Sequence, residues 1–179
     1  MTANQERESA EERLAGLGLE LPQPMPPAGS YLGVKRHGEL LYVSGHGPVR
    51  VDDRGRLPGR ADREIAWADV PANLVRGKVG RDVTAGQAHE AARLTGLFLL
   101  AAVRAEAGSL DRVASVLKVF GMVNCAPGFT ATPAVLDGCS ELLVSVFGPR
   151  VGQHARSAIG VAELPFDICV EIEMVVALG

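Results

Sequence analysis

Arg156 is the residue whose type and position most directly suggest ligand chemistry. It stands near the start of the segment ARSAIGVAEL, 155–164, where a strand is predicted to begin. A guanidinium holds a carboxylate through two parallel hydrogen bonds, so this arginine could clamp an anionic ligand. Two other interpretations stay open from the residue alone: a surface arginine, or one half of an ion pair with Glu163 or Asp167.

A second candidate segment is VSGHGPV, 43–49, in which Gly45 and Gly47 flank His46. Glycine at a strand end lets a ligand or another backbone approach closely, although a structural bulge explains the pattern equally well. No pair among the four histidines has the spacing of metal ligands, so we expect no metal. The sequence also lacks a P-loop and a GxGxxG after a strand, and we expect no cofactor.

Acidic side chains interrupt the last apolar segment, ICVEIEMVVAL, 168–178. Alternate side chains of a strand point to opposite faces. One face would carry Cys169, Glu171, Glu173 and Val175, and the other Val170, Ile172, Met174 and Val176. The second set is wholly apolar and should meet helices. The first face is either open to water or, since it is partly apolar, buried in an oligomer interface lined with a few polar groups.

The elements that must position these residues form a small α+β domain. A hairpin is predicted where YLGVKR and ELLYVSG flank His37-Gly38, and a further strand or turn near GKVG, 77–80. The β-branched run at 113–123 and the segments 155–164 and 168–178 complete the strands. Helices on one face of a mixed sheet follow from this order.

Two helices have clear boundary signals. Thr84 with Gln87 fits a capping box, and Gly108 is placed to end the first helix. The second opens at Thr132-Pro133, with threonine as N-cap and proline at the first position, and closes at 148–149. We divide the chain into a polar N-terminal arm with a short helix, 1–20, and a single domain, 21–179.

Composition restricts the class of protein. The chain has 179 residues, of which 47% are hydrophobic and 22% charged, as in an ordinary globular domain. A net charge of −3 gives no general attraction to polyanions, so we expect no nucleic-acid partner. The three cysteines lack a CxxC pair, and neither a secretory signal nor a membrane-length apolar run is visible. We therefore expect a cytoplasmic protein with no membrane partner.

Taken together, the segments resemble the RidA/YjgF family, once called endoribonuclease L-PSP, from about Leu21 onward. The resemblance is carried by SYLGVKRHGELLYVSGHGPV, by EAARLTGLFLLAAVRAEAGSLDRVASVLKVFGMVN and above all by ARSAIGVAELPFDICVEIEMVVAL. The last block is similar to the signature R-S-x-x-x-V-x-x-L-P-x-x-x-x-V-E-I-E. The longer N-terminal arm and an insert near 61–82 are typical of a divergent branch.

The resemblance implies a chorismate-mutase-like fold with a mixed six-stranded sheet and two main helices on one face. It also implies a homotrimer with a central barrel and ligand clefts between subunits. Arg156 would grip the carboxylate of a small metabolite, and Glu171 would position or activate water. Tyr31 and Gly45 would line the same cleft. The implied reaction is hydrolysis of a reactive 2-imino acid to a 2-oxo acid and ammonia, without a cofactor.

Two positions depart from the family pattern. His46 replaces a glutamine in S-G-Q, and Asp137 aligns with an asparagine of the second helix; we place both at the substrate site. A carboxylate there would repel a carboxylate-bearing ligand, so the substrate could differ. Two alternatives therefore stay open: a biosynthetic hydrolase or tautomerase acting on a specialised metabolite, and a non-catalytic trimer that binds a metabolite or a partner protein. Ribonuclease activity ranks last, because a stacking platform or basic channel for RNA is missing.

Overall fold

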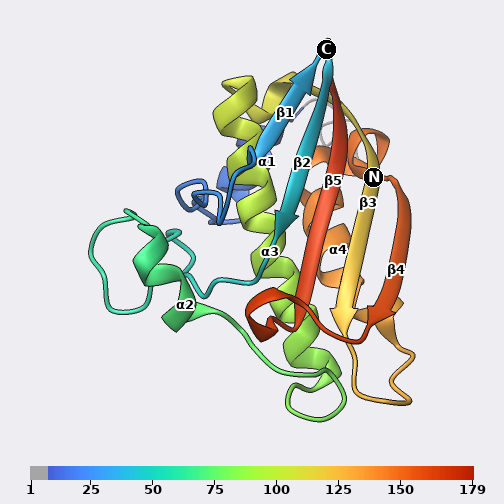
Figure 1. Cartoon of the computed structure of the whole chain (residues 1–179). Helices are drawn as coiled ribbons and strands as arrows, with labels where there is room; N and C mark the ends of the chain where they lie inside the picture. Colours follow the sequence, from blue (N-terminus) through green and yellow to red (C-terminus); the bar gives the residue numbers. More distant parts are fainter. Residues whose placement is uncertain (1–7) are drawn as a thin grey trace.

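The computed structural model describes residues 8–179 and has helices packed on one face of a sheet (Figure 1). The five strands have the order β1-β2-β5-β3-β4. They are β1 (Val34–His37), β2 (Leu40–His46), β3 (Val113–Asn124), β4 (Ala155–Val161) and β5 (Val170–Leu178). β3 and β4 pair in parallel, and the other neighbouring pairs are antiparallel. The predicted α+β class is confirmed.

The sheet has five strands, and the expected sixth is wrong. A strand or a turn was predicted near 77–80, and Val79 there forms isolated bridges instead of a ladder. Gly77 and Gly80 have φ values of +107° and +92°. This left-handed region turns the chain away from extended pairing on both sides of Val79.

Helix α3 (Ala85–Ala107) begins and ends at the predicted residues. The Thr84 hydroxyl accepts a hydrogen bond from the Gln87 N–H at 3.2 Å, and the Gln87 side chain accepts one from the Thr84 N–H at 2.9 Å. Gly108 follows with a φ of +87° and ends the helix. The capping box is therefore confirmed.

Helix α4 (Thr132–Gly152) begins one residue earlier than predicted. Ala131 is the N-cap, and the Thr132 hydroxyl instead donates to the carbonyl of Ala158 at 3.0 Å. The predicted threonine cap is wrong, because this hydroxyl joins the helix to β4. Gly148, with a φ of +72°, interrupts the helix where its end was predicted.

The alternation predicted for the last strand is confirmed in β5. Val170, Ile172, Met174 and Val176 are buried against the helices, with exposed fractions of at most 2%. Glu171 and Glu173 lie on the opposite face. Cys169, expected beside them, precedes the strand and is fully buried.

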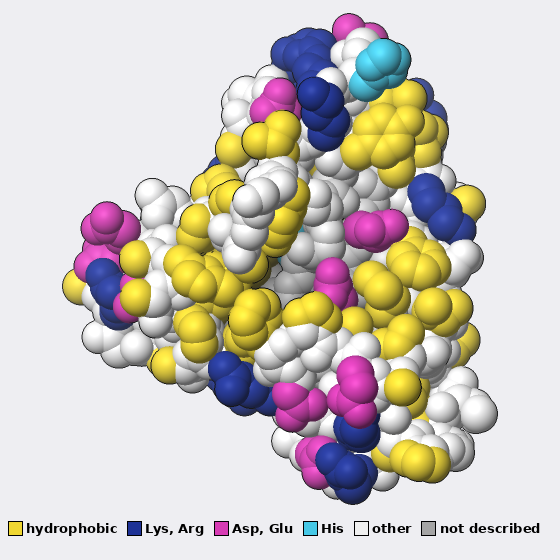
Figure 2. All heavy atoms as spheres, in the orientation of Figure 1, with side chains coloured by type: hydrophobic (Ala, Val, Ile, Leu, Met, Phe, Trp, Pro, Cys, Tyr) yellow, Lys and Arg dark blue, Asp and Glu magenta, His cyan; other side chains and the backbone are white. Residues whose placement is uncertain are grey.

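No helix covers the second face of the sheet within residues 8–179. Tyr42, Leu117 and Ile159 are 41–47% exposed. In Figure 2 hydrophobic side chains gather over this face, with a few charged groups between them. Such an apolar surface is larger than isolated exposed residues would give, and it is typical of a surface that another chain covers.

The N-terminal arm packs more closely than the sequence suggested. In helix α1 (Ala10–Gly16), Leu14 is only 3% exposed and belongs to the main core. The Glu11 carboxylate accepts a hydrogen bond from the N–H of Leu110 at 3.0 Å. The helix therefore belongs to the folded body.

The segment between β2 and α3 builds a second small core beside the sheet. It contains η1 (Trp67–Asp69) and α2 (Val70–Asn73). Val70 and Leu74 are buried against Phe98 of α3 and Ile168, which precedes β5. This core fixes the segment against one end of β2 and β5. Within residues 8–179 no helix has the length and apolar character needed to cross a bilayer.

Candidate functional site

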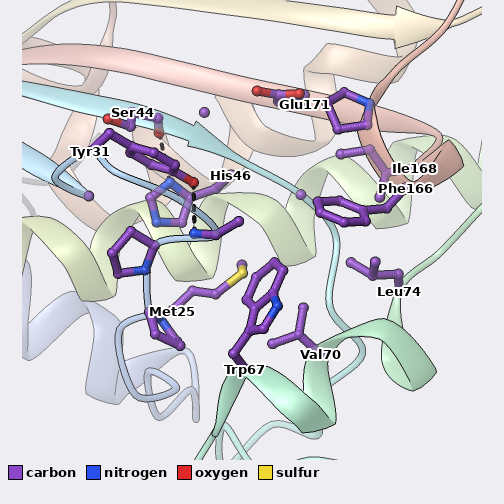
Figure 3. A pocket seen from close by; sticks show the side chains of 17 residues that line it. Met25, Tyr31, Ser44, His46, Trp67, Val70, Leu74, Phe166, Ile168 and Glu171 are labelled. Carbon is purple, nitrogen blue, oxygen red and sulfur yellow. Dashed lines mark hydrogen bonds between the residues drawn. The ribbon is translucent and has the colours of Figure 1, made fainter.

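A cavity of about 430 Å³ opens at the end of β2, between the sheet, the proline-rich segment 21–30 and the 61–82 insert (Figure 3). Four of the residues that sequence reasoning assigned to the site line it: Tyr31, Gly45, His46 and Glu171. A volume of this size suits a small metabolite.

Glu171 lies directly over Gly45. A side chain built on Gly45 would overlap a carboxylate oxygen of Glu171 and lie 2.9 Å from its carboxylate carbon. Glycine is thus required for the glutamate to reach this position. Burial, and secondarily the charge of Glu173, raise the pKa of Glu171, and no hydrogen bond opposes this shift. The carboxylate is free to bind a water or a ligand proton.

His46 is held in one tautomer. Its Nδ1 lies 2.7 Å from the carbonyl oxygen of Ser44, and since a carbonyl can only accept, Nδ1 carries the proton. Nε2 is left as an acceptor. Burial lowers the pKa of His46, although the bond to Ser44 partly opposes this, so the ring is neutral near pH 7.

Tyr31 joins the cavity to the proline-rich segment 21–30. Its hydroxyl accepts a hydrogen bond from the N–H of Ala28 at 3.2 Å, which leaves its own proton free to donate. The hydroxyl of Ser44 donates to the carbonyl of Leu32 at 2.7 Å. Ser44 therefore has a structural role and is not placed as a nucleophile.

An apolar wall faces these polar groups. Trp67 and Phe166 meet edge to face, with ring centroids 5.6 Å apart and planes at 64°. Met25, Val70 and Leu74 extend the wall (Figure 3). Sequence reasoning missed these residues. The only signal was that a chain with one tryptophan carries it in the irregular insert.

Arg156 lies elsewhere, in a hydrogen-bonded cluster between β4 and α4. Its Nη1 donates to the Asp137 carboxylate at 2.8 Å and to the Ser140 hydroxyl at 2.9 Å, and Nη2 donates to the carbonyl of Pro133 at 3.3 Å. The ion pair is thus with Asp137, not with Glu163 or Asp167. Nε and the second Nη2 proton have no partner within residues 8–179, and these two can hold a carboxylate side-on.

His154 holds this cluster from behind. Its Nδ1 lies 2.6 Å from the carbonyl of Gly152, so Nδ1 carries the proton and Nε2 accepts from the Ser140 hydroxyl at 3.0 Å. The Ser140 oxygen is then oriented to accept from Arg156. Burial is the main cause that lowers the pKa of His154, which keeps this ring neutral as well.

The described residues offer no evident metal or thiol chemistry. No group of three or more His, Cys, Asp and Glu side chains within residues 8–179 is placed to hold a metal ion. Burial raises the pKa of the Cys125 thiol, and raises those of Cys139 and Cys169 to about 12. All three therefore stay as unreactive thiols near neutral pH.

Known proteins are similar to this chain in sequence and in fold. The model of the family described as "YjgF/chorismate mutase-like, putative endoribonuclease" matches residues 70–176. This chain belongs to the RidA/YjgF family. The match spans α3, the strands β3 to β5 and the Arg156 cluster.

Relatives cover nearly the whole chain. Protein TCP17 of Trypanosoma cruzi is 37% identical over 166 residues, which are 93% of this chain and 92% of that protein. The crystal structure of Atu1372 from Agrobacterium tumefaciens, a protein of unknown function, is 36% identical, with a TM-score of 0.73 over 95% of this chain and 92% of that one. A "putative endoribonuclease" from Shewanella oneidensis is 27% identical, with a TM-score of 0.80 over 96% and 100%.

The site residues that the RidA/YjgF resemblance implied fall into two groups in one chain. Tyr31, Gly45, His46 and Glu171 meet at the cavity, whereas Arg156 and Asp137 meet at the α4–β4 edge. Arg156 pairs with Val119, whose side chain is buried on the helix face, while Glu171 is on the open face. Arg156 and Glu171 lie two strands apart across the sheet and three residues apart along it. Their Cα atoms are therefore about 14 Å apart. Within one subunit they cannot hold one small ligand.

Proposed function

We propose that this protein hydrolyses reactive 2-imino acids to 2-oxo acids and ammonia, in clefts between the subunits of a homotrimer. The observation that carries the proposal is the carboxylate of Glu171, which has no hydrogen-bond partner within residues 8–179 and lies over Gly45 inside the cavity. Family membership supports the choice of reaction class. Neither a metal nor a coenzyme enters the proposed reaction.

The proposed chemistry asks little of the protein. A protonated imine is already electrophilic, so the site must orient it and supply a positioned water. Glu171 accepts a hydrogen bond from that water while the water oxygen bonds to the imine carbon. Glu171 takes a proton from the water as the carbinolamine forms and returns it to the nitrogen. The carbon–nitrogen bond then breaks, ammonia leaves, and Glu171 accepts the hydroxyl proton as the carbonyl forms.

Arg156 of a neighbouring subunit is proposed to hold the substrate carboxylate. Within one chain, Arg156 and Glu171 lie on opposite faces of the sheet. A second copy must therefore supply the arginine that meets the ligand at Glu171. The free Nε and Nη2 protons of Arg156 suit a bidentate carboxylate. Asp137 and Ser140 hold the other edge of the guanidinium in place.

The open sheet face supports the proposed trimer. Its exposed apolar side chains, including Tyr42 and Ile159, would be buried if three sheets met around a central barrel. Burying apolar surface stabilises an assembly by about 25 cal/mol for each Å² removed from water. We further propose a cytoplasmic location and a small carboxylate-bearing metabolite as partner, with no nucleic-acid or membrane partner.

A coupled assay tests the reaction. An amino-acid oxidase generates 2-imino acids, and semicarbazide traps those that remain. Hydrolysis of the imine by the protein is measured as a decrease in the amount of trapped product. We expect the imine to disappear faster with the wild type and no acceleration with Arg156→Ala, while sedimentation shows the same trimer for both. Arg54→Ala, which removes an exposed arginine outside the cavity and the cluster, serves as the matched control. Full activity of Arg156→Ala would overturn the clamp.

His46 favours a second candidate, a hydrolase or tautomerase for a specialised metabolite. Its neutral ring presents Nε2 as a proton acceptor at the cavity, a group that simple imine hydrolysis does not require. Inactivity on small, branched and aromatic imino acids by a folded trimer would shift the assignment to this candidate. Tight ligand binding without turnover of any substrate would instead indicate a binding module.

A further inference from the structure

The part of the cavity remote from Glu171 is almost wholly apolar. Trp67, Met25 and Val70 lie farthest from Glu171, and Phe166 and Ile168 lie between them and the glutamate. In Figure 3 the indole of Trp67 points up into the cavity from the insert, while Glu171 lies at the opposite end. A ligand that places its polar atoms near Glu171 therefore meets this wall with the rest of its length.

The apolar wall is built and fixed, and does not result from a loose loop. Val70 and Leu74 are 1% and 7% exposed within the second core, so the short helices that carry Trp67 are anchored. The N–H of Ile65 donates to the side chain of Gln23 at 3.1 Å, which joins the insert to the proline-rich segment 21–30. The wall is thus preorganised before any ligand arrives.

We propose that the ligand of this site carries a large apolar side chain, aromatic or branched, next to its carboxylate. The proposal deepens the proposed function, on which it rests for the position of the carboxylate. A three-carbon ligand would leave most of the 430 Å³ as water against apolar walls. A phenyl or isobutyl group would displace this water and contact two aromatic rings and a thioether.

Trp67 provides a direct measurement, because it is the only tryptophan in the chain. The full-length protein is titrated with propanoate, 4-methylpentanoate and 3-phenylpropanoate while tryptophan emission is recorded. These probes share the carboxylate and differ in their apolar part. We expect 3-phenylpropanoate to bind at least about tenfold more tightly than propanoate and to change the emission. Equal affinities for the three probes would overturn the proposal.

Two variants locate the effect. Phe166→Ala removes a ring that is 51% exposed, so the fold should tolerate it, and Trp67→Ala removes its partner. Calorimetry should show that each variant loses severalfold in affinity for 3-phenylpropanoate and little for propanoate. Leu17→Ala is the matched control, since Leu17 is 48% exposed at the C-cap of α1 and lies outside the cavity. An unchanged preference in both variants would place the probe elsewhere and contradict the proposal.

The outcomes separate this inference from the proposed reaction. If the protein preferred the larger probes but hydrolysed no imino acid, the apolar-ligand proposal would stand and the proposed deaminase activity would be contradicted. Hydrolysis with equal kcat/KM for alanine- and phenylalanine-derived imines would keep the deaminase and remove the assignment.

Discussion

The Glu171 region and the Arg156 region differ in how their charged groups are held. Arg156 makes three hydrogen bonds, to Asp137, Ser140 and Pro133, and His154 orients the serine. Glu171 has a raised pKa and lies against Gly45. The guanidinium is thus fixed by its neighbours, whereas the carboxylate has no hydrogen-bond partner within residues 8–179. Fixed groups position a ligand, and an unsatisfied carboxylate is available to react.

The largest effect should come from removing the unsatisfied charge. Glu171→Gln keeps the size of the side chain and cannot accept a proton, so we expect kcat to fall by about 10²- to 10⁴-fold with a smaller change in KM. Steady-state kinetics in the coupled assay measure both. Glu106→Gln, which changes an exposed glutamate of α3 outside the cavity, is the control. Equal losses of kcat and binding would make Glu171 structural.

A somewhat smaller effect should follow from moving this carboxylate. In Gly45→Ala the new methyl group displaces Glu171, and a displacement of about 1 Å can cost roughly 100-fold in kcat. The decisive measurement is the double variant. Gly45→Ala should change little in a Glu171→Gln background, since both act through one group. Simple additivity would contradict this link.

A change beside Arg156 should have a weaker effect on the kinetics. Asp137→Asn keeps an acceptor for Arg156 and removes a negative charge beside the expected substrate carboxylate. We expect KM to fall a fewfold with kcat unchanged, as measured with the wild type in parallel. A rise in KM would show that the aspartate is needed mainly to position the guanidinium.

The smallest effect concerns stability and pH. His46 and His154 both have lowered pKa values, so the unfolded chain binds more protons than the folded one as the pH falls through the ordinary histidine range. The free energy of unfolding should therefore decrease there. His46→Gln should remove part of this decrease in urea titrations at several pH values, and His154 should retain the rest. If the pH dependence of the free energy of unfolding were the same in His46→Gln and the wild type, folding would not lower the pKa of His46.

The two regions also differ in how far the sequence predicted them. Local patterns were sufficient for α3, because Thr84, Gln87 and Gly108 lie next to the turns that they cap. Period-2 alternation placed Glu171 correctly on the face away from the helices. Tyr31, Gly45 and His46, which the family motif placed with Glu171, line the same cavity as it does.

Contacts between distant segments could not be predicted in this way. Trp67 and Met25 lie in irregular and proline-rich stretches without periodicity, and only the fold brings them to Phe166. The bond between Arg156 and Asp137 depends on how α4 packs beside β4. The missing sixth strand had the same cause, because left-handed glycines, not composition, decide how the chain passes 77–80.

The position of β5 has a consequence for synthesis on the ribosome. It lies in the middle of the sheet, between β2 and β3, yet it is translated after all four other strands. Until residues 170–178 leave the exit tunnel, the nascent chain holds two separate strand pairs with unpaired inner edges. Such edges invite aggregation or chaperone binding. Because β5 also carries Glu171, closure of the sheet and completion of the cavity are a single event.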